Sequence, residues 1–291
     1  MSTSLLDKQE SQPWTRLLEP NGHYFENKIS IVTGASSGIG KAIAIELAHH
    51  GAKVILSSRN RNRLEQVAHT IRMNGDYAEV HEADVTYFES CESLINKTIE
   101  KYGRIDLLVN NAGISMRANF LDVKIEVLKR LMDTNFWGTV YCTKLALAEL
   151  IKNKGSLISI SSICGITPLP GRTGYAASKH ALDGFIDTIR VENLDNNLHV
   201  LSVHPGFTTS NIRNVALNKD GEEQGETPRD EDKMMSAAKV ATEVVKAIQN
   251  HKRDITLTSE GKLITWIYKT MPSIADKILY NEMKKEEGSP I

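Results

Sequence analysis

Three side chains in the middle of the chain have the types and the spacing needed to move a proton on or off an alcohol oxygen. Tyr175 and Lys179 are four residues apart, so in a helix they share one face. A nearby cation favours the phenolate and lowers the pKa of a tyrosine, which is otherwise about 10. Ser162, thirteen residues before the tyrosine, offers a hydroxyl that can hold a substrate oxygen. The alternative is that Tyr175 and Lys179 only belong to a solvated helix face.

The elements that must position these side chains alternate between strand and helix patterns. Strand-like runs lie at residues 28–34, 53–57, 77–83, 105–109, 156–160, 200–203 and 254–257. Helical patterns lie at residues 41–50, 61–73, 88–102, 124–152, 175–195 and 237–250. This alternation predicts an α/β fold with parallel βαβ units in a doubly wound sheet.

The chain is predicted to form a single domain with an extension at each end. No linker or composition break divides residues 28–258, which we expect to be the domain. Residues 1–27 are polar and predict a surface arm or disorder, and residues 259–291 form a C-terminal tail. Residues 211–233 are polar and lack periodicity, which indicates a lid near the ligand site or disorder.

The turn after the first predicted strand is suited to a nucleotide. It reads Thr-Gly-Ala-Ser-Ser-Gly-Ile-Gly at residues 33–40. Glycines let the chain turn sharply and let a pyrophosphate touch backbone, and the following helix N-terminus attracts the anion. The spacing is GxxxGxG, so the pattern alone also fits a generic glycine-rich loop, but its place between a strand and a helix favours the nucleotide. The expected binding residues here are Gly34, Ser36, Ser37, Gly38, Ile39 and Gly40.

The end of the second predicted strand indicates NADP(H) rather than NAD(H). It reads Ser58-Arg59-Asn60, with no carboxylate to repel a 2′-phosphate. A guanidinium can hold a phosphate with two hydrogen bonds, so Arg59 is the expected contact. The alternative is that Arg59 is a solvated surface charge.

Other expected cofactor contacts follow the third and fourth strands. Asp84, next to Val85, could accept a hydrogen bond from the adenine amino group or could cap the next helix. Asn111, Ala112 and Gly113 end the fourth strand, where small residues allow close approach. Asn135 is unfavourable inside a helix, which indicates a function or a local distortion there.

Together these motifs resemble those of the short-chain dehydrogenase/reductase family over about residues 28–258. The resemblance implies one Rossmann-like domain with three αβα layers. It implies that Tyr175 is the general acid/base, that Lys179 lowers its pKa and binds the nicotinamide ribose, and that Ser162 holds the substrate oxygen. It also implies that Asn135 positions a water in a proton relay. Pro205, Gly206 and Thr208 would flank the nicotinamide carboxamide, although the neighbouring threonine and serine leave the choice of hydroxyl open.

The expected function is transfer of a hydride between NADP(H) and a ketone or secondary alcohol. Because NADPH is usually kept reduced in cells, we expect carbonyl reduction. Phe207 and the loop at 211–233 are expected to touch the substrate. The alternative is a catalytically silent NADP-binding regulator or scaffold, which would not need Asn135, Ser162, Tyr175 and Lys179 together.

Composition narrows the expected partners. Basic and acidic residues nearly balance, 35 against 36, so no charge favours nucleic acid or an anionic surface. The three cysteines have no metal or disulfide spacing, so we expect no metal and a reducing, cytoplasmic compartment. Cys164 is expected to be a buried structural thiol, with a place near the site as the alternative.

Two further features concern assembly. The long helices at 124–152 and 175–195 carry broad apolar stripes, and the family resemblance implies a homodimer or homotetramer through them. The tail at 262–285 is rich in apolar residues and could lie on a membrane surface, delivering a steroid- or lipid-like ketone. The alternative, which we favour, is that it packs against the core or a partner subunit.

Overall fold

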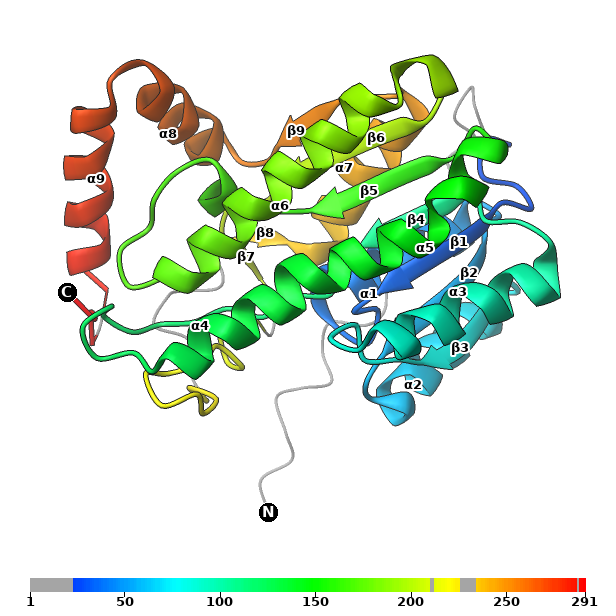
Figure 1. The fold of residues 1–291 in the computed structure, drawn as a ribbon, viewed down its shortest axis with the longest axis horizontal. Coiled ribbons are helices and arrows are strands. Elements are labelled where there is room, and N and C mark those ends of the chain that lie inside the picture. The colour runs from blue at the N-terminus through cyan, green and yellow to red at the C-terminus, as the bar shows by residue number, and fades with distance from the viewer. Residues whose placement is uncertain (1–22, 210–211, 226–233, 287) are drawn as a thin grey trace.

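The structure, a computed structural model, describes residues 23–209, 212–225, 234–286 and 288–291. Its centre is a parallel sheet with the strand order β3, β2, β1, β4, β5, β6 and β9 (Figure 1). These strands span Ala78–Glu82, Lys53–Ser58, Ile29–Thr33, Leu107–Asn110, Ser156–Ile160, His199–His204 and Asp254–Thr256. The order proceeds outward from β1 on one side and from β4 on the other, which confirms the doubly wound α/β fold.

Helices cover both faces of this sheet. One face carries α1 (Gly38–His49), α2 (Arg61–Met73) and α7 (Ala237–Gln249). The other carries α3 (Phe88–Tyr102), α5 (Gly138–Lys152) and α6 (Thr173–Glu192). Side chains alternate along β1, so that Val32 packs under the first helix layer and Ile31 under the second. The strand is therefore buried on both faces, Ser30 and Thr33 included, as is usual for a strand of a parallel sheet.

The long helix predicted at 124–152 is interrupted. It consists of α4 (Ile125–Met132), a π-helical turn at Asp133–Trp137, and α5. Asn135 lies inside the π-helical turn, and its amide bonds to the backbone of Ile114 rather than facing solvent. The local distortion that this asparagine indicated is confirmed, and π-helical turns of this kind often occur at functional sites.

The predicted N-terminal arm falls mostly outside the described residues. Residues 23–27, however, pack with the domain. Phe25 is fully buried, the Asn27 amide donates to the Gly51 carbonyl at 2.9 Å, and the Tyr24 hydroxyl lies 3.5 Å from Nε2 of His251. The domain therefore begins before residue 28, because this turn closes the core at the start of β1.

Short elements between the strands and helices complete the domain. A 3-10 turn at Ile163–Gly165 follows β5, and another at Leu194–Asn196 follows α6. After β6, strand β7 (Thr208–Thr209) pairs with β8 (Met235–Ser236). Of the predicted lid at 211–233, residues 212–225 are described. Within them the Leu217 amide donates to the Ser115 carbonyl at 2.9 Å, and the Arg117 amide donates to the Leu217 carbonyl at 2.8 Å, so this part is fixed to the loop after β4.

The tail folds into two helices, α8 (Ser259–Thr270) and α9 (Pro272–Lys284), beside the carboxyl end of the sheet (Figure 1). Thr265, Ala275 and Met283 are buried, whereas Trp266 and Ile274 are 58% and 50% exposed. The tail thus packs in part on the chain and keeps some apolar side chains outside. Within the described ranges, no helix has the length and apolar character to cross a membrane.

Candidate active site

The glycine turn between β1 and α1 forms one end of a large cavity. Gly34 and Gly38 have φ of 65° and 55°, values that side chains other than glycine rarely adopt. A Cβ on Gly40 would lie 2.3 Å from Nδ2 of Asn111 and 2.4 Å from the Gly34 carbonyl oxygen. The turn is therefore packed so closely that glycine is required, and Gly40 supports the cavity from behind without lining it.

Thr33 and Asn111 hold this turn against the end of β4. The Thr33 hydroxyl accepts hydrogen bonds from the amides of Asn111 and Ala112, at 3.0 and 3.1 Å. The Asn111 side-chain amide donates to the Thr33 carbonyl at 2.9 Å and to the Gly34 carbonyl at 3.2 Å. These bonds fix two adjacent loops from neighbouring strands, so the wall of the cavity is formed before any ligand arrives.

The start of α1 fits a pyrophosphate. Ser37 is its N-cap residue with an extended backbone, and its side chain makes no capping hydrogen bond. Ser37, Gly38 and Ile39 all line the cavity. A helix of this length carries partial positive charge at its N-terminus, so an anion placed here is stabilised. The residues present fit the nucleotide that the sequence predicts.

The expected 2′-phosphate region lies at the end of β2. Arg59 and Arg63 line the cavity, while the Asn60 side chain caps α2 by accepting from the Arg63 amide at 3.0 Å. Ser58 accepts a hydrogen bond from the Asn60 amide at 3.3 Å. Glu82, paired with Ser58 in the sheet register, lines a neighbouring hollow together with Arg59. Two guanidinium groups therefore face the cavity, with one carboxylate nearby on β3.

Asp84 takes part in local structure. Its carboxylate accepts hydrogen bonds from the Thr86 amide at 3.0 Å and from the Thr86 hydroxyl at 2.9 Å. These bonds hold the turn that leads into α3, but Asp84 does not cap the helix, because the N-cap residue is Tyr87, whose side chain makes no capping hydrogen bond. Asp84 and Val85 also line the cavity, so a role toward the adenine stays a prediction.

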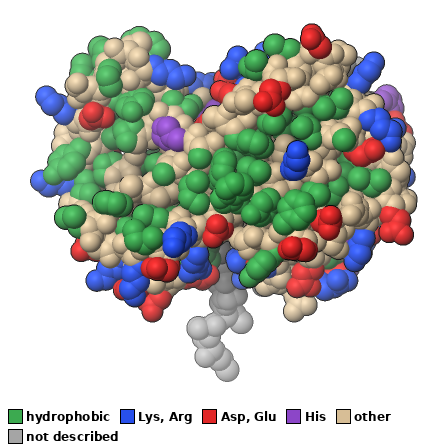
Figure 2. All heavy atoms as spheres, viewed as in Figure 1, with side chains coloured by type: hydrophobic (Ala, Val, Ile, Leu, Met, Phe, Trp, Pro, Cys, Tyr) green, Lys and Arg blue, Asp and Glu red, His purple; other side chains and the backbone are tan. Residues whose placement is uncertain are grey.

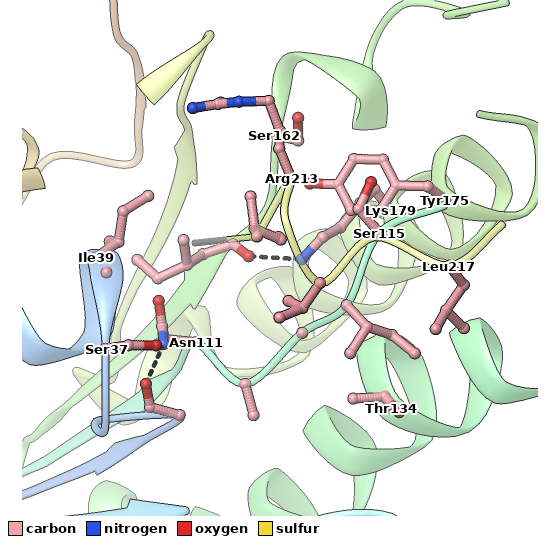
Figure 3. A pocket seen from close by; sticks show the side chains of 18 of the residues that line it. Ser37, Ile39, Asn111, Ser115, Thr134, Ser162, Tyr175, Lys179, Arg213 and Leu217 are labelled. Carbon is pink, nitrogen blue, oxygen red and sulfur yellow. Dashed lines mark hydrogen bonds between the residues drawn. The ribbon is translucent and has the colours of Figure 1, made fainter. Parts of the chain in front are cut away.

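The other end of the cavity holds the proposed acid/base group. Figure 3 shows the Tyr175 hydroxyl and the Lys179 ammonium, both from α6, directed toward the same space, with Ser162 beside the phenol. The Lys179 Nζ lies 5.9 Å from the centre of the Tyr175 ring and donates to the Ile160 carbonyl at 2.8 Å. The three residues that the sequence selects are therefore brought together, and the solvated-face alternative is wrong because Lys179 is buried.

Burial sets the proton affinities of this pair. It raises the pKa of Tyr175 above the usual 10, and Cys164 and Asp183 raise it further, while a hydrogen bond with Ser162 and the charge of Arg172 lower it. Burial also lowers the pKa of Lys179 to about 8. The prediction that Lys179 lowers the pKa of Tyr175 below its usual value is therefore wrong, because burial disfavours the charged forms of both groups.

Asn135 supports the site from behind. It is fully buried, and it does not line the cavity. Its oxygen accepts from the Ile114 amide at 2.8 Å, and its nitrogen donates to the Ile114 carbonyl at 3.0 Å and to the Ser178 hydroxyl at 2.9 Å. It ties the loop after β4 to α6 next to Lys179. A water-positioning role for Asn135 stays a prediction.

One cavity of about 830 Å³ joins the two ends. The predicted site residues that line it are Gly34, Ser36, Ser37, Gly38, Ile39, Ser58, Arg59, Asn60, Asp84, Val85, Asn111, Ala112, Gly113, Ser162, Tyr175, Lys179, Pro205, Gly206 and Thr208. Of the predicted set, only Gly40 and Asn135 stand behind the wall. Phe207 lines the cavity as expected, and so do Ile212, Arg213, Val215, Leu217 and Glu223 from the described part of the loop.

Sequence reasoning missed several lining residues, among them the following four. Ser115 follows the fourth strand, Arg130 lies on α4, Arg172 precedes α6, and Glu286 follows α9. Arg172 stands three residues before Tyr175, so its nearness to the phenol was the one available signal. Glu286 lies far from the site in sequence and no local pattern marks it. Cys164 is buried and also lines the cavity, so both alternatives for this thiol hold.

The sequence of this chain is similar to those of known proteins. A model of the family described as short chain dehydrogenase matches residues 28–220. "Dehydrogenase/reductase SDR family member 7B" of Mus musculus is 31% identical over 273 residues, covering 91% of this chain and 84% of that protein. "11-beta-hydroxysteroid dehydrogenase-like 2" of Arabidopsis thaliana is 40% identical over 206 residues, covering 68% of this chain and 66% of that protein.

Solved structures agree on the architecture. An alcohol dehydrogenase from the archaeon Thermococcus sibiricus, complexed with 5-hydroxy-NADP, has a TM-score of 0.69 and 25% identity, covering 80% of this chain and 96% of that one. A short chain dehydrogenase/reductase from Burkholderia phymatum, in complex with NAD, has a TM-score of 0.78 and 20% identity, covering 86% and 95%. The second likeness supports the fold alone.

Proposed function

Because the chain belongs to the short-chain dehydrogenase/reductase family, an oxidoreductase family, we propose that it is an NADPH-dependent carbonyl reductase. The observation that carries the proposal is the convergence of Tyr175, Lys179 and Ser162 on one cavity whose other end is the glycine turn. Acid/base groups and a nucleotide cradle in one enclosed space provide what reduction of a ketone to a secondary alcohol requires.

In the proposed mechanism, this chain's residues orient the carbonyl and supply the proton. The cofactor, when bound, supplies the hydride that reaches the carbonyl carbon. Ser162 donates a hydrogen bond to the carbonyl oxygen, and Tyr175 gives that oxygen its proton. The raised pKa keeps the phenol protonated at neutral pH, which suits a general acid. Lys179, charged below about pH 8, would hold the ribose hydroxyls of the cofactor.

The reaction is tested by following NADPH consumption with a panel of ketones. The wild-type chain is expected to consume NADPH, and Tyr175→Phe is expected to lose about 10²–10⁴-fold in kcat while its Kd for NADPH stays within about twofold. The matched control is Tyr280→Phe, which removes a hydroxyl from an exposed tyrosine on α9. Near-native turnover by Tyr175→Phe would refute the proton route.

The cofactor preference rests on Arg59 and Arg63. Both face the cavity at the end of β2, and the strand ends in Ser57-Ser58 without a carboxylate. We expect Arg59→Ala to reduce the ratio of kcat/KM for NADPH over NADH by about tenfold or more, since a guanidinium–phosphate pair is a strong charge-assisted interaction. Arg61→Ala is the control, because Arg61 lies on the neighbouring surface and does not line the cavity. An unchanged ratio in Arg59→Ala would refute the preference.

The proposed substrate is a largely apolar ketone, steroid- or lipid-like in size. The substrate end carries the apolar side chains of Ile163, Leu169, Phe207 and Leu217, and the cavity is within the range of small-molecule sites. The relative from Arabidopsis is called hydroxysteroid dehydrogenase-like, which supports this class for the panel. Greater kcat/KM for short polar ketones than for steroid ketones would contradict this part.

A catalytically silent NADP-binding protein is the competing proposal. It predicts binding of NADPH without consumption for every ketone and alcohol in the panel. The buried Lys179 argues against it, since burial of an ammonium is costly and a scaffold has no need of one at this place.

Assembly and location complete the proposal. Figure 2 shows hydrophobic side chains gathered over α5 and α6, where Phe136, Trp137, Tyr141 and Phe185 form an aromatic cluster. We propose a homodimer or homotetramer through this face. Analytical ultracentrifugation of wild-type and Trp137→Glu protein tests it.

The three cysteines are free thiols and buried, which fits the proposed cytoplasmic location. Exposed apolar residues of α8 and α9 are proposed to meet a partner subunit rather than a membrane, and liposome co-sedimentation distinguishes these.

A further inference from the structure

The end of the chain returns to the substrate end of the cavity. After α9, Glu286 lines the cavity. Downstream, the Asn119 side-chain amide donates to the Pro290 carbonyl at 3.1 Å. Gly171, with φ of 71°, is so close to Pro290 that a Cβ there would lie 2.3 Å from its ring. In Figure 1 the C-terminus lies beside the connection between β4 and α4. Glu286 therefore forms part of the cavity wall, and Pro290 packs against Asn119 and Gly171 nearby.

Glu286 lies between two arginines. Its Oε2 is 3.6 Å from Nε of Arg117 and 3.7 Å from Nη2 of Arg172. The Glu286 side chain is 4% exposed and each arginine side chain is 10% exposed, so all three charges are largely removed from water. Arginine stays protonated in proteins, and buried charges require a counter-charge. Glu286 thus supplies negative charge at a place where the chain has concentrated positive charge.

This cluster faces the place where a substrate must lie. Arg172 and Glu286 both line the cavity, and Arg172 immediately precedes the first turn of α6, which carries Tyr175. Two buried guanidinium groups next to a cavity are a site suited to a carboxylate. In this chain that position is taken by a carboxylate of the chain itself.

We propose that Glu286 is a specificity-determining residue that occupies the arginine site in place of a substrate carboxylate, so that the cavity accepts uncharged carbonyl compounds and rejects anionic ones. The inference rests on the proposed carbonyl reduction and deepens it. An anionic substrate would have to approach a buried carboxylate of like charge and compete with it for the arginines, whereas an uncharged ketone would not.

The test compares two ketones that differ in charge and by one methyl group, 4-acetylbenzoate and its methyl ester. With wild-type protein, kcat/KM for the ester is expected to exceed that for the acid by about tenfold or more. Glu286→Gln keeps the shape and removes the charge, and it is expected to raise the acid-to-ester ratio by about tenfold or more. The control is Glu282→Gln, which removes an exposed carboxylate one turn earlier and is expected to leave the ratio unchanged. An unchanged ratio in Glu286→Gln overturns the proposal.

A binding measurement separates this inference from the proposed activity. Benzoate is titrated calorimetrically into wild-type, Glu286→Gln and Glu282→Gln protein, with no turnover required. About tenfold tighter benzoate binding by Glu286→Gln than by wild type supports the inference even if no ketone is reduced. Equal affinity overturns it even if ketones are reduced. If Glu286→Gln fails to fold, the wild-type protein alone tests the proposal. Equal kcat/KM for the acid and the ester, or equal inhibition of the wild-type protein by the two compounds, overturns it.

Discussion

Replacement of Lys179 by methionine should make the protein more stable at neutral pH while it removes activity. Burial lowers the pKa of Lys179 from 10.5 to about 8. A difference of about 2.5 pKa units corresponds to about 3 kcal/mol of cost for keeping the ammonium charged in the folded chain. Methionine has similar length and no charge, but it loses the hydrogen bond to the Ile160 carbonyl, worth about 1 kcal/mol. The expected net gain is about 2 kcal/mol at pH 7.

The difference in stability between the wild-type protein and Lys179→Met should depend on pH. Between about pH 8 and 10.5 the unfolded wild-type chain binds a proton at Lys179 that the folded chain has lost, so wild-type stability gains from this residue as pH rises. The advantage of Lys179→Met is therefore complete below about pH 8 and decreases toward pH 10.5. The raised pKa of Tyr175 is present in both proteins, so its effect largely cancels when the two are compared.

Scanning calorimetry of the two proteins from pH 6.5 to 10 measures the difference. A gain of about 2 kcal/mol corresponds to a rise in Tm of about 3 °C for a chain of this size. The control is Lys152→Met, where the ammonium is 64% exposed and pairs with Glu149, and a change within about 0.5 kcal/mol is expected. A lower Tm for Lys179→Met at pH 7, or a difference that does not vary with pH, would refute the reasoning.

Four further outcomes are expected. Asn135→Ala leaves the Ile114 backbone groups without their side-chain partners and should lower the free energy of unfolding by about 2–4 kcal/mol in a urea titration. The control, Asn250→Ala at an exposed helix end, should lower it by less than about 1 kcal/mol. Phe25→Ala opens a cavity in the core and should lower the free energy of unfolding by about 3–5 kcal/mol in the same titration. A loss below about 1 kcal/mol would show that the turn at 23–27 lies outside the domain. Gly171→Ala should lower Tm and increase proteolysis at the C-terminus, because the new methyl group meets Pro290. The kcat/KM of reduction should fall as pH rises through about 8, as Lys179 loses its proton, and a profile that is flat to pH 10 would contradict this.

The sheet and its helices could be predicted because their signals are local. The bounds predicted for α2 and α3, Arg61–Met73 and Phe88–Tyr102, are those of the structure. In both, apolar spacing defines the buried face, and Gly75 and Gly103 follow with positive φ after the helix. The glycine turn could also be identified, since the need for glycine at positions 34 and 38 arises from the backbone itself.

What could not be predicted depends on contacts between distant parts of the chain. The break in the helix at 124–152 exists because Asn135 bonds to Ile114, and that partner is known only once the loop after β4 is placed. Lys179 was expected to act as a fixed cation. Its degree of burial, which lowers its pKa, follows from packing around α6. Glu286 meets Arg172 only because α8 and α9 turn the chain back toward the cavity.

The docking of the last residues has a practical consequence for recombinant protein. A purification tag appended after Ile291 would begin two residues beyond Pro290, which rests on Gly171 and accepts a hydrogen bond from Asn119. A bulky or charged extension there would pull on the segment that carries Glu286, and kinetic constants would then describe an altered wall. Material intended for substrate screening should therefore carry no affinity tag next to this segment.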